Sequence, residues 1–296
     1  MILSLNRRFV FVHVHKCAGT SIEVALAPLL AANDLIIGST AEGEKHKKLL
    51  GEMVGLHKHS GAAAARALIG AERWKNFYTF GFVRHPIDRL YSLYTYAIGQ
   101  LERKPMTLTE AEAYALNGEL PSRPPYCFKA AQAAFASENF DAFLRDPRCW
   151  QDDGAKPQWQ SLCDEDGQRL VKFVGHVERI DKDWQRVQNR MGVTAPIGVQ
   201  NKSLGTEQQE ASPQLAKPTP PRGWHEEELS AQAWAMIKRH CLRDFRIFGY
   251  ALPAPLQRHV ERKSAAQIEA AAAVQSAQLP VGASMEIRAP IPAPVV

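Results

Sequence analysis

The stretch FVFVHVHKCAGTSIEVAL, Phe9–Leu26, constrains the fold more than any other part of the chain. Its first half, Phe9–Val14, is β-branched and aromatic, which predicts a buried strand. Apolar residues then recur with helical spacing over Ser21–Leu30, and Pro28 is placed to close that helix. Because a short polar loop joins the buried strand to the helix, this stretch predicts the first unit of an α/β fold.

The same plan recurs later in the chain. Phe77–Val83 is a second strand candidate, and Pro86 is favoured at a first helical position. Further expected elements are an alanine-rich helix at Ser60–Ile69, a strand at Leu170–Val174, and helices at Asp181–Met191 and Glu226–Leu242. Strands that alternate with helices favour a central, mostly parallel sheet flanked by helices.

Composition indicates one domain followed by a tail. The chain has 296 residues, and its 45% hydrophobic and 23% charged content is typical of globular proteins. We expect one domain over residues 1–252, in which the proline-containing region 98–168 forms irregular helices and loops over one face. Residues 253–296 are rich in alanine and proline, which predicts a largely disordered tail with a helical stretch near residues 265–273.

Charge and cysteine content exclude several classes of protein. A net charge of +5 suits an anionic ligand but is small for a nucleic-acid binder, so no nucleic-acid partner is expected. No signal peptide is recognisable and no apolar run reaches about 18 residues, so we expect a cytoplasmic protein without an integral membrane segment. The five cysteines lack C-x-x-C spacing, which favours reduced thiols over a zinc site.

The loop after the first strand has the residues that a phosphate site needs. A strand that ends at a helix start presents backbone N–H groups and the positive end of the helix dipole. Lys16 adds a charge, Gly19 allows close approach, and Thr20 and Ser21 offer hydroxyls. Lys16 precedes the glycine, unlike the lysine of the nucleoside-triphosphate motif. The alternative is a plain strand-to-helix turn in which a hydroxyl caps the helix.

A second cation follows the second strand. Arg84 leaves Phe77–Val83 at the carboxyl edge of the expected sheet, where such sheets bind ligands, and its guanidinium can hold a phosphate through two hydrogen bonds. Ser92 lies two turns into the following helix. The alternatives are a salt bridge between Arg84 and Asp88 and an ordinary exposed or capping role for Ser92.

Together these motifs resemble a known family. HKCAGTSIE followed by FVRHPIDRLYSLY is similar to the two nucleotide-binding signatures of sulfotransferases that use 3′-phosphoadenosine 5′-phosphosulfate (PAPS), especially the carbohydrate enzymes that resemble heparan sulfate 2-O-sulfotransferase and its bacterial relatives. The resemblance continues through Asn201–Ser203 and Arg239–Tyr250, and so covers residues 9 to about 250. It implies a P-loop-like three-layer fold.

The resemblance also implies roles for individual residues. The first loop would hold the 5′-phosphosulfate, Arg84 and Ser92 the 3′-phosphate, and Lys202 and Ser203 would contact the nucleotide from a closing loop. The residues implied for the first loop are Lys16, Cys17, Ala18, Gly19, Thr20 and Ser21. Lys16 would also neutralise charge on the leaving phosphate during transfer. The family requires no metal, so none is expected.

GLHKHS, Gly55–Ser60, is similar to a family segment that includes the catalytic base. By that match His59 is the first candidate and His57 the second, because a histidine can take a proton near neutral pH. The alternative is a solvated polar loop. Two histidines separated by a single residue, without further ligands, are a weak metal signal.

The resulting hypothesis is a PAPS-dependent sulfotransferase that modifies a hydroxyl of a carbohydrate acceptor, whose specificity we expect in region 98–168. Two other functions stay open. A nucleotide-dependent kinase also binds phosphate with a loop between a strand and a helix, but it needs Mg²⁺ and acidic residues to hold the Mg²⁺. A non-catalytic module would bind the nucleotide without turnover. The sequence does not name the acceptor or the oligomeric state.

Overall fold

A computed structural model describes residues 1–198 and 223–257. The chain divides after Ala251, and Met1–Ala251 forms one compact unit that holds every helix and strand named below. Of the second unit the structure describes Leu252–Gln257, where the amides of Leu256 and Gln257 both donate to the Pro253 carbonyl.

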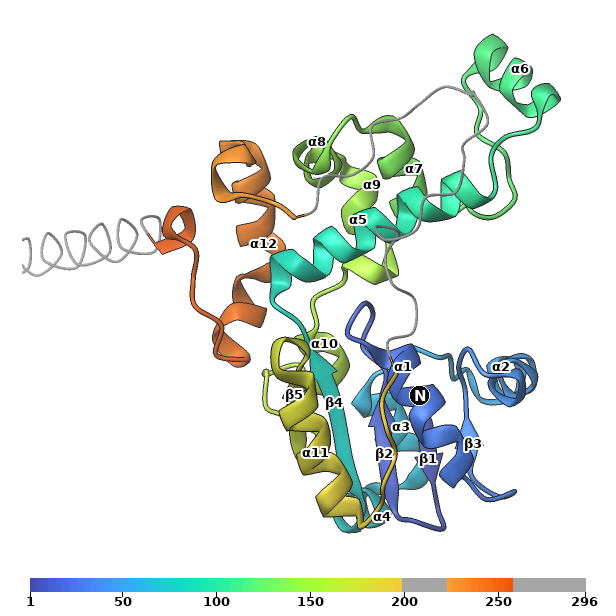
Figure 1. Cartoon of the computed structure of the whole chain (residues 1–296), viewed down its shortest axis with the longest axis vertical. Helices are drawn as coiled ribbons and strands as arrows, with labels where there is room; N and C mark the ends of the chain where they lie inside the picture. Colours follow the sequence, from blue (N-terminus) through green and yellow to red (C-terminus); the bar gives the residue numbers. More distant parts are fainter. Residues whose placement is uncertain (199–222, 258–296) are drawn as a thin grey trace, which may run out of the picture. The chain divides into compact units, whose positions relative to one another are not determined.

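The strands of the first unit form one five-stranded sheet, seen in the lower half of Figure 1. Its strands are β1 (Ile2–Ser4), β2 (Phe9–Val12), β3 (Leu35–Ile36), β4 (Tyr78–Val83) and β5 (Phe173–His176), in the order β3-β1-β2-β4-β5. β2, β4 and β5 are parallel neighbours, whereas β1 pairs antiparallel with both β2 and β3. Four of the five described strands therefore run in one direction, which confirms the predicted α/β fold with a mostly parallel sheet.

Helices connect the strands and extend past one end of the sheet. In chain order they are α1 (Gly19–Leu26), α2 (Ala41–Val54), α3 (Ala62–Ile69), α4 (Ala71–Asn76), α5 (Pro86–Arg103), α6 (Leu108–Asn117), α7 (Lys129–Ala136), α8 (Phe140–Arg145), α9 (Pro147–Gln151), α10 (Trp159–Leu162), α11 (Ile180–Met191) and α12 (Ala231–Ile247). Short 3₁₀ turns lie at η1 (Ala27–Leu29), η2 (Asp153–Ala155), η3 (Val177–Arg179) and η4 (Glu226–Glu228). Among the described helices, none is both long and apolar enough to cross a membrane.

Side-chain alternation along β4 places helices on both faces of the sheet. Phe82 contacts Trp184 of α11, with ring centroids 6.4 Å apart. On the opposite face, a Cβ at Gly81 would lie 2.6 Å from Leu162 of α10. The buried rings of Phe11 and Phe80 lie side by side across β2 and β4. Burying such a ring contributes about 1.5–3 kcal/mol, so these aromatic side chains hold the centre of the sheet.

The structure corrects several expected boundaries. The short antiparallel strands β1 and β3 were not predicted, because two or three residues show no periodicity. α5 continues to Arg103, past the expected boundary at residue 98, and the following region contains the regular helices α6–α10. The helix expected from Glu226 begins at Ala231, because the Ser230 hydroxyl caps it there. The expected tail helix at residues 265–273 lies outside the described residues.

Candidate active site

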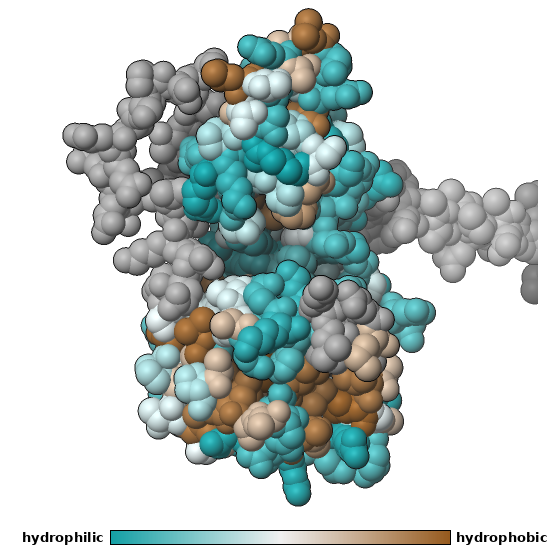
Figure 2. All heavy atoms as spheres, turned by 90° about the vertical axis from the view of Figure 1, so that its right-hand side faces the viewer, coloured by the Kyte–Doolittle hydropathy of each residue, from teal (hydrophilic) through white to brown (hydrophobic). Residues whose placement is uncertain are grey.

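A cavity of about 710 Å³ lies at the carboxyl ends of β2 and β4. Its lining joins the loop between β2 and α1, the residues after β4, and one side of α5 and α7. Figure 2 shows a surface hollow between the part that holds the sheet and the part that holds α5, with mainly hydrophilic residues around it. A cavity of this size and position suits a nucleotide-sized ligand.

The loop between β2 and α1 is held in an unusual conformation. Lys16 and Ala18 both have positive φ angles, 61° and 58°. A left-handed residue other than glycine costs roughly 1–2 kcal/mol, so surrounding contacts must fix this loop. The Cys17 thiol, 1% exposed, donates to the Gln158 side chain at 3.2 Å. The buried Cys17 side chain, between these two strained residues, therefore anchors the loop through this sulfur–amide hydrogen bond and a contact of 3.3 Å with the His15 carbonyl.

The start of α1 is open to an anion. Ala18 precedes the helix and provides no side-chain cap, so the first N–H groups of α1 are not satisfied by a capping side chain. Gly19, Thr20 and Ser21 line the cavity at this point. A Cβ at Gly19 would lie 2.0 Å from the His13 ring, so only glycine fits where the helix begins against that histidine. Backbone N–H groups and hydroxyls therefore face the cavity together.

Two cations face the cavity without a carboxylate partner among the described residues. Lys16 and Arg84 both line it, and neither forms an ion pair within residues 1–198 and 223–257. The expected alternative, an Arg84–Asp88 salt bridge, is absent there, because Asp88 instead accepts from the Trp224 indole at 2.6 Å. Lys16 and Arg84, without carboxylate partners among the described residues and beside the uncapped N–H groups of α1, are the groups that a site for a multiply charged anion needs.

Lys16 rests against an aromatic ring. Its Nζ lies 3.8 Å from the centroid of Tyr96, a residue of α5. Burial, followed by the charge of Arg84, lowers the pKa of Lys16 to about 8. At neutral pH the ammonium is still mainly protonated, and an arriving phosphate would stabilise it further.

His59 is oriented by the end of β2. Its Nδ1 lies 3.1 Å from the His13 carbonyl, which can only accept, so Nδ1 carries the proton and Nε2 keeps its lone pair. The His15 ring stacks on it with centroids 3.4 Å apart. Burial, with the His15 charge second, lowers the pKa of His59 to about 3. By contrast, His57 is exposed and is not among the residues that line the cavity.

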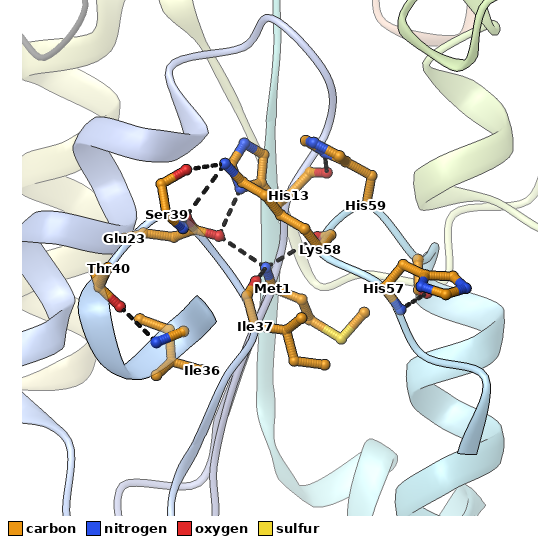
Figure 3. A network of polar contacts seen from close by, with 12 residues as sticks. Met1, His13, Glu23, Ile36, Ile37, Ser39, Thr40, His57, Lys58 and His59 are labelled. Carbon is orange, nitrogen blue, oxygen red and sulfur yellow. Dashed lines mark hydrogen bonds and ion pairs between the residues drawn. The ribbon is translucent and has the colours of Figure 1, made fainter. Parts of the chain in front are cut away.

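Beneath the histidines lies a buried carboxylate (Figure 3). Glu23 is fully buried; its Oε1 lies 2.7 Å from His13 Nδ1 and 2.9 Å from the Met1 amine. Its Oε2 accepts from the Ser39 amide at 3.2 Å and lies 3.8 Å from Lys58 Nζ, which also contacts the Ser39 hydroxyl. Burial acts to raise the pKa of Glu23, but the His13 hydrogen bond and nearby cations lower it to about 2. Glu23 therefore holds both the strand end and the loop that precedes His59.

The wall opposite the sheet is more apolar. Tyr96 of α5 and Phe128, directly before α7, line the cavity and are 45% and 54% exposed. Leu93, Ala130 and Ala131 complete this side, together with Gln100 and Asp153. Exposed rings beside a few polar groups form a surface that can hold a second ligand next to the cations.

The structure brings most of the predicted site residues to one place. Residues 16–21, Arg84, Ser92 and His59 all line the cavity, whereas Lys202 and Ser203 lie outside the described residues. Sequence reasoning did not identify Glu23 or Gln158. Glu23 shares the core face of α1 with Ile22 and Leu26, which was the available signal, but no motif marks Gln158. Within the described residues, no group of three histidine, cysteine or acidic side chains is placed to hold a metal.

Comparison with known proteins gives one match. A family model described as "Sulfotransferase family" matches residues 1–251. No curated protein and no solved structure matches the chain. The matched range contains every residue of the cavity described above.

Proposed function

The chain belongs to the sulfotransferase family, and we propose that it transfers the sulfuryl group of PAPS to a hydroxyl of a carbohydrate. The observation that carries this proposal is the pair of cations without carboxylate partners in the described part of the chain. Lys16 and Arg84 follow neighbouring parallel strands and face one cavity, as a ligand with phosphate at two separate positions requires.

The residues present fit such a nucleotide. Lys16, Thr20 and Ser21, with the uncapped start of α1, would hold the 5′-phosphosulfate. Arg84 and Ser92 would hold the 3′-phosphate, for which the planar guanidinium offers two parallel hydrogen bonds. PAPS itself supplies the activated sulfuryl group.

His59 would act as the base. Its Nδ1–H is committed to the His13 carbonyl, so Nε2 is available to take a proton, and burial keeps the ring neutral at pH 7. As the acceptor oxygen forms its bond to sulfur and the bond between sulfur and the phosphate oxygen breaks, the hydroxyl proton passes to Nε2. The Lys16 ammonium offsets the charge that develops on the departing phosphate.

The acceptor would occupy the apolar wall. The exposed rings of Tyr96 and Phe128 offer flat surfaces for the C–H face of a sugar, while Gln100 can hydrogen-bond to its hydroxyls. This arrangement supports a carbohydrate as the acceptor class.

Calorimetric titration tests the proposal. The protein is titrated with 3′-phosphoadenosine 5′-phosphate (PAP), the desulfated product, and with ATP, both without Mg²⁺. We expect PAP to bind and ATP to bind much more weakly. Arg84→Ala should weaken PAP binding about tenfold or more, or about 1.4 kcal/mol. Arg73→Ala, at an exposed arginine of α4, is the matched control and should bind like the wild type.

Two results would contradict the proposal. If ATP binds more tightly than PAP, the cavity belongs to a triphosphate-using enzyme such as a kinase. If PAP binds equally well to the wild type and Arg84→Ala, the assignment of the 3′-phosphate to Arg84 is wrong.

A further inference from the structure

Gln158 is a fully buried side chain at the start of α10. Its amide contacts both cation-bearing segments of the cavity. The Oε1 atom accepts from the Arg84 backbone N–H at 2.9 Å and from the Cys17 thiol at 3.2 Å. The Nε2 atom donates to the Arg84 carbonyl at 2.8 Å.

These contacts fix the backbone of Arg84 on both sides. One amide group satisfies both the N–H and the C=O of that residue, as a neighbouring strand would, where the chain leaves β4 and turns into α5. Since the Cα–Cβ direction follows from the backbone, the amide fixes the point and direction from which the Arg84 side chain extends toward the cavity. The same Oε1 atom holds Cys17, which lies between the two strained residues Lys16 and Ala18.

Gln158 is itself held firmly. Its backbone N–H donates to Asp244 Oδ2 at 2.9 Å, and the Trp159 N–H donates to Oδ1 at 2.8 Å. Asp244 lies on α12 and is fully buried. A carboxylate that accepts from two consecutive amides fixes the start of α10, so the Gln158 side chain projects from a rigid base.

From this geometry we propose that Gln158 is a positioning residue that sets Arg84 relative to the Lys16 loop. It thereby determines the preference for a nucleotide with a 3′-phosphate over one without it. The inference rests on the proposed function, in which Arg84 binds the 3′-phosphate. Two-point recognition of a phosphate demands accurate placement, and a displacement of about 1 Å can cost orders of magnitude in a positioned interaction.

The test compares dissociation constants for PAP and for 5′-AMP, which lacks the 3′-phosphate. Gln158→Met keeps the length and volume of the side chain but removes its hydrogen bonds. We expect the PAP preference over AMP to fall about tenfold or more, because the Arg84 backbone is no longer fixed, with a smaller loss of AMP affinity, because Cys17 in the 5′-phosphate loop also loses a partner. Gln160→Met, at an exposed glutamine of the same helix, is the matched control and should keep the wild-type preference.

A double variant provides the readout that a merely structural role would not change. In the Arg84→Ala background, Gln158→Met should no longer reduce the PAP preference, because the group it positions has been removed. If Gln158→Met fails to fold, Gln158→Glu serves instead. It retains acceptor oxygens for the Arg84 N–H and Cys17 but has no donor for the Arg84 carbonyl, and its PAP preference should also fall.

The outcomes separate the two proposals. If the wild type prefers PAP but the folded Gln158 variants keep that preference, or lose PAP and AMP affinity by the same factor, the positioning role is overturned while the proposed function stands. If the wild type does not distinguish PAP from AMP, the proposed function itself fails, and the positioning role with it.

Discussion

At the scale of single residues, His57 and His59 show how position decides chemistry. They are two residues apart in a polar segment, and the sequence alone gives no physical reason to choose between them. The fold turns His59 under the end of β2, where the His13 carbonyl fixes its tautomer. His57 is exposed, and its backbone N–H donates to the Ser60 hydroxyl.

We therefore expect different effects at the two positions. His59→Ala should lower kcat for transfer of radiolabelled sulfate from PAPS to a carbohydrate panel by about 10²–10⁴-fold, because the proton acceptor is lost. PAP affinity should be nearly unchanged, since the variant leaves both cations in place. His57→Ala is the matched control, with wild-type kcat. Equal loss in both variants, or none in His59→Ala, would contradict the role of His59.

The position of residues that follow strand ends could be predicted from the sequence. Lys16 and Arg84 were placed at one cavity because residues that follow parallel strands meet at the same sheet edge. Gln158 could not be predicted in this way, because the residues that its side chain contacts, Arg84 and Cys17, lie 74 and 141 positions earlier in the sequence. The spacing of apolar and polar residues along the chain does not indicate contacts between residues so far apart in sequence.

At the scale of elements, the junction of β2 with α1 is the most constrained part of the site. Replacing a helical glycine by alanine usually stabilises a helix by about 1 kcal/mol. At Gly19 the added Cβ would overlap the His13 ring, at 2.0 Å, and His13 is itself hydrogen-bonded to Glu23. The local gain is therefore outweighed by displacement of a buried ring.

Gly19→Ala should accordingly destabilise the protein by about 1–3 kcal/mol, the usual cost of overpacking, and weaken PAP binding. Urea unfolding and calorimetry measure the two effects. Val24→Ala, at a 40% exposed position of the same helix, is the control and should bind PAP normally. A more stable Gly19→Ala variant with unchanged PAP affinity would show that His13 does not hold the start of α1.

Sequence patterns predicted several helices and the longer strands but not the shortest strands. Pro86 marked the start of α5, and β-branched and aromatic runs predicted β2 and β4. β1 and β3 contain three and two residues and are fixed by pairing with partners distant in sequence. Such strands exist only because the neighbouring sheet edge is available, so tertiary context rather than local propensity forms them.

At the scale of the whole molecule, the buried histidines make stability depend on pH. Burial is the main cause that lowers the pKa values of His13, His15 and His59 from 6.5 to about 3. Between these pH values the unfolded chain binds protons that the folded chain does not. The contribution of these histidines to stability is therefore full above about pH 6.5 and is lost as the pH falls toward 3.

The free energy of unfolding in urea should thus be lower at pH 5 than at pH 7.5, by about 1–2 kcal/mol for each histidine that stays neutral. His59→Asn should reduce this pH dependence, because it removes one of the three buried rings. Glu23 adds little in this range, because its carboxyl is ionised in both states until the pH approaches 4.5. Equal stability at the two pH values would show that the histidines are not buried in neutral form.

The order of the elements has one further consequence. β4 and β5 are neighbouring parallel strands, and the chain between them, residues 84–172, contains α5–α10. Residues 104–151 within it supply α6–α9 without contributing a strand. A segment of this kind can lengthen, shorten or be exchanged between relatives without a change in the order of the strands in the sheet. Evolution or protein engineering can therefore replace this segment as one continuous stretch of the gene. The two strand ends that carry Lys16 and Arg84 are then left unchanged.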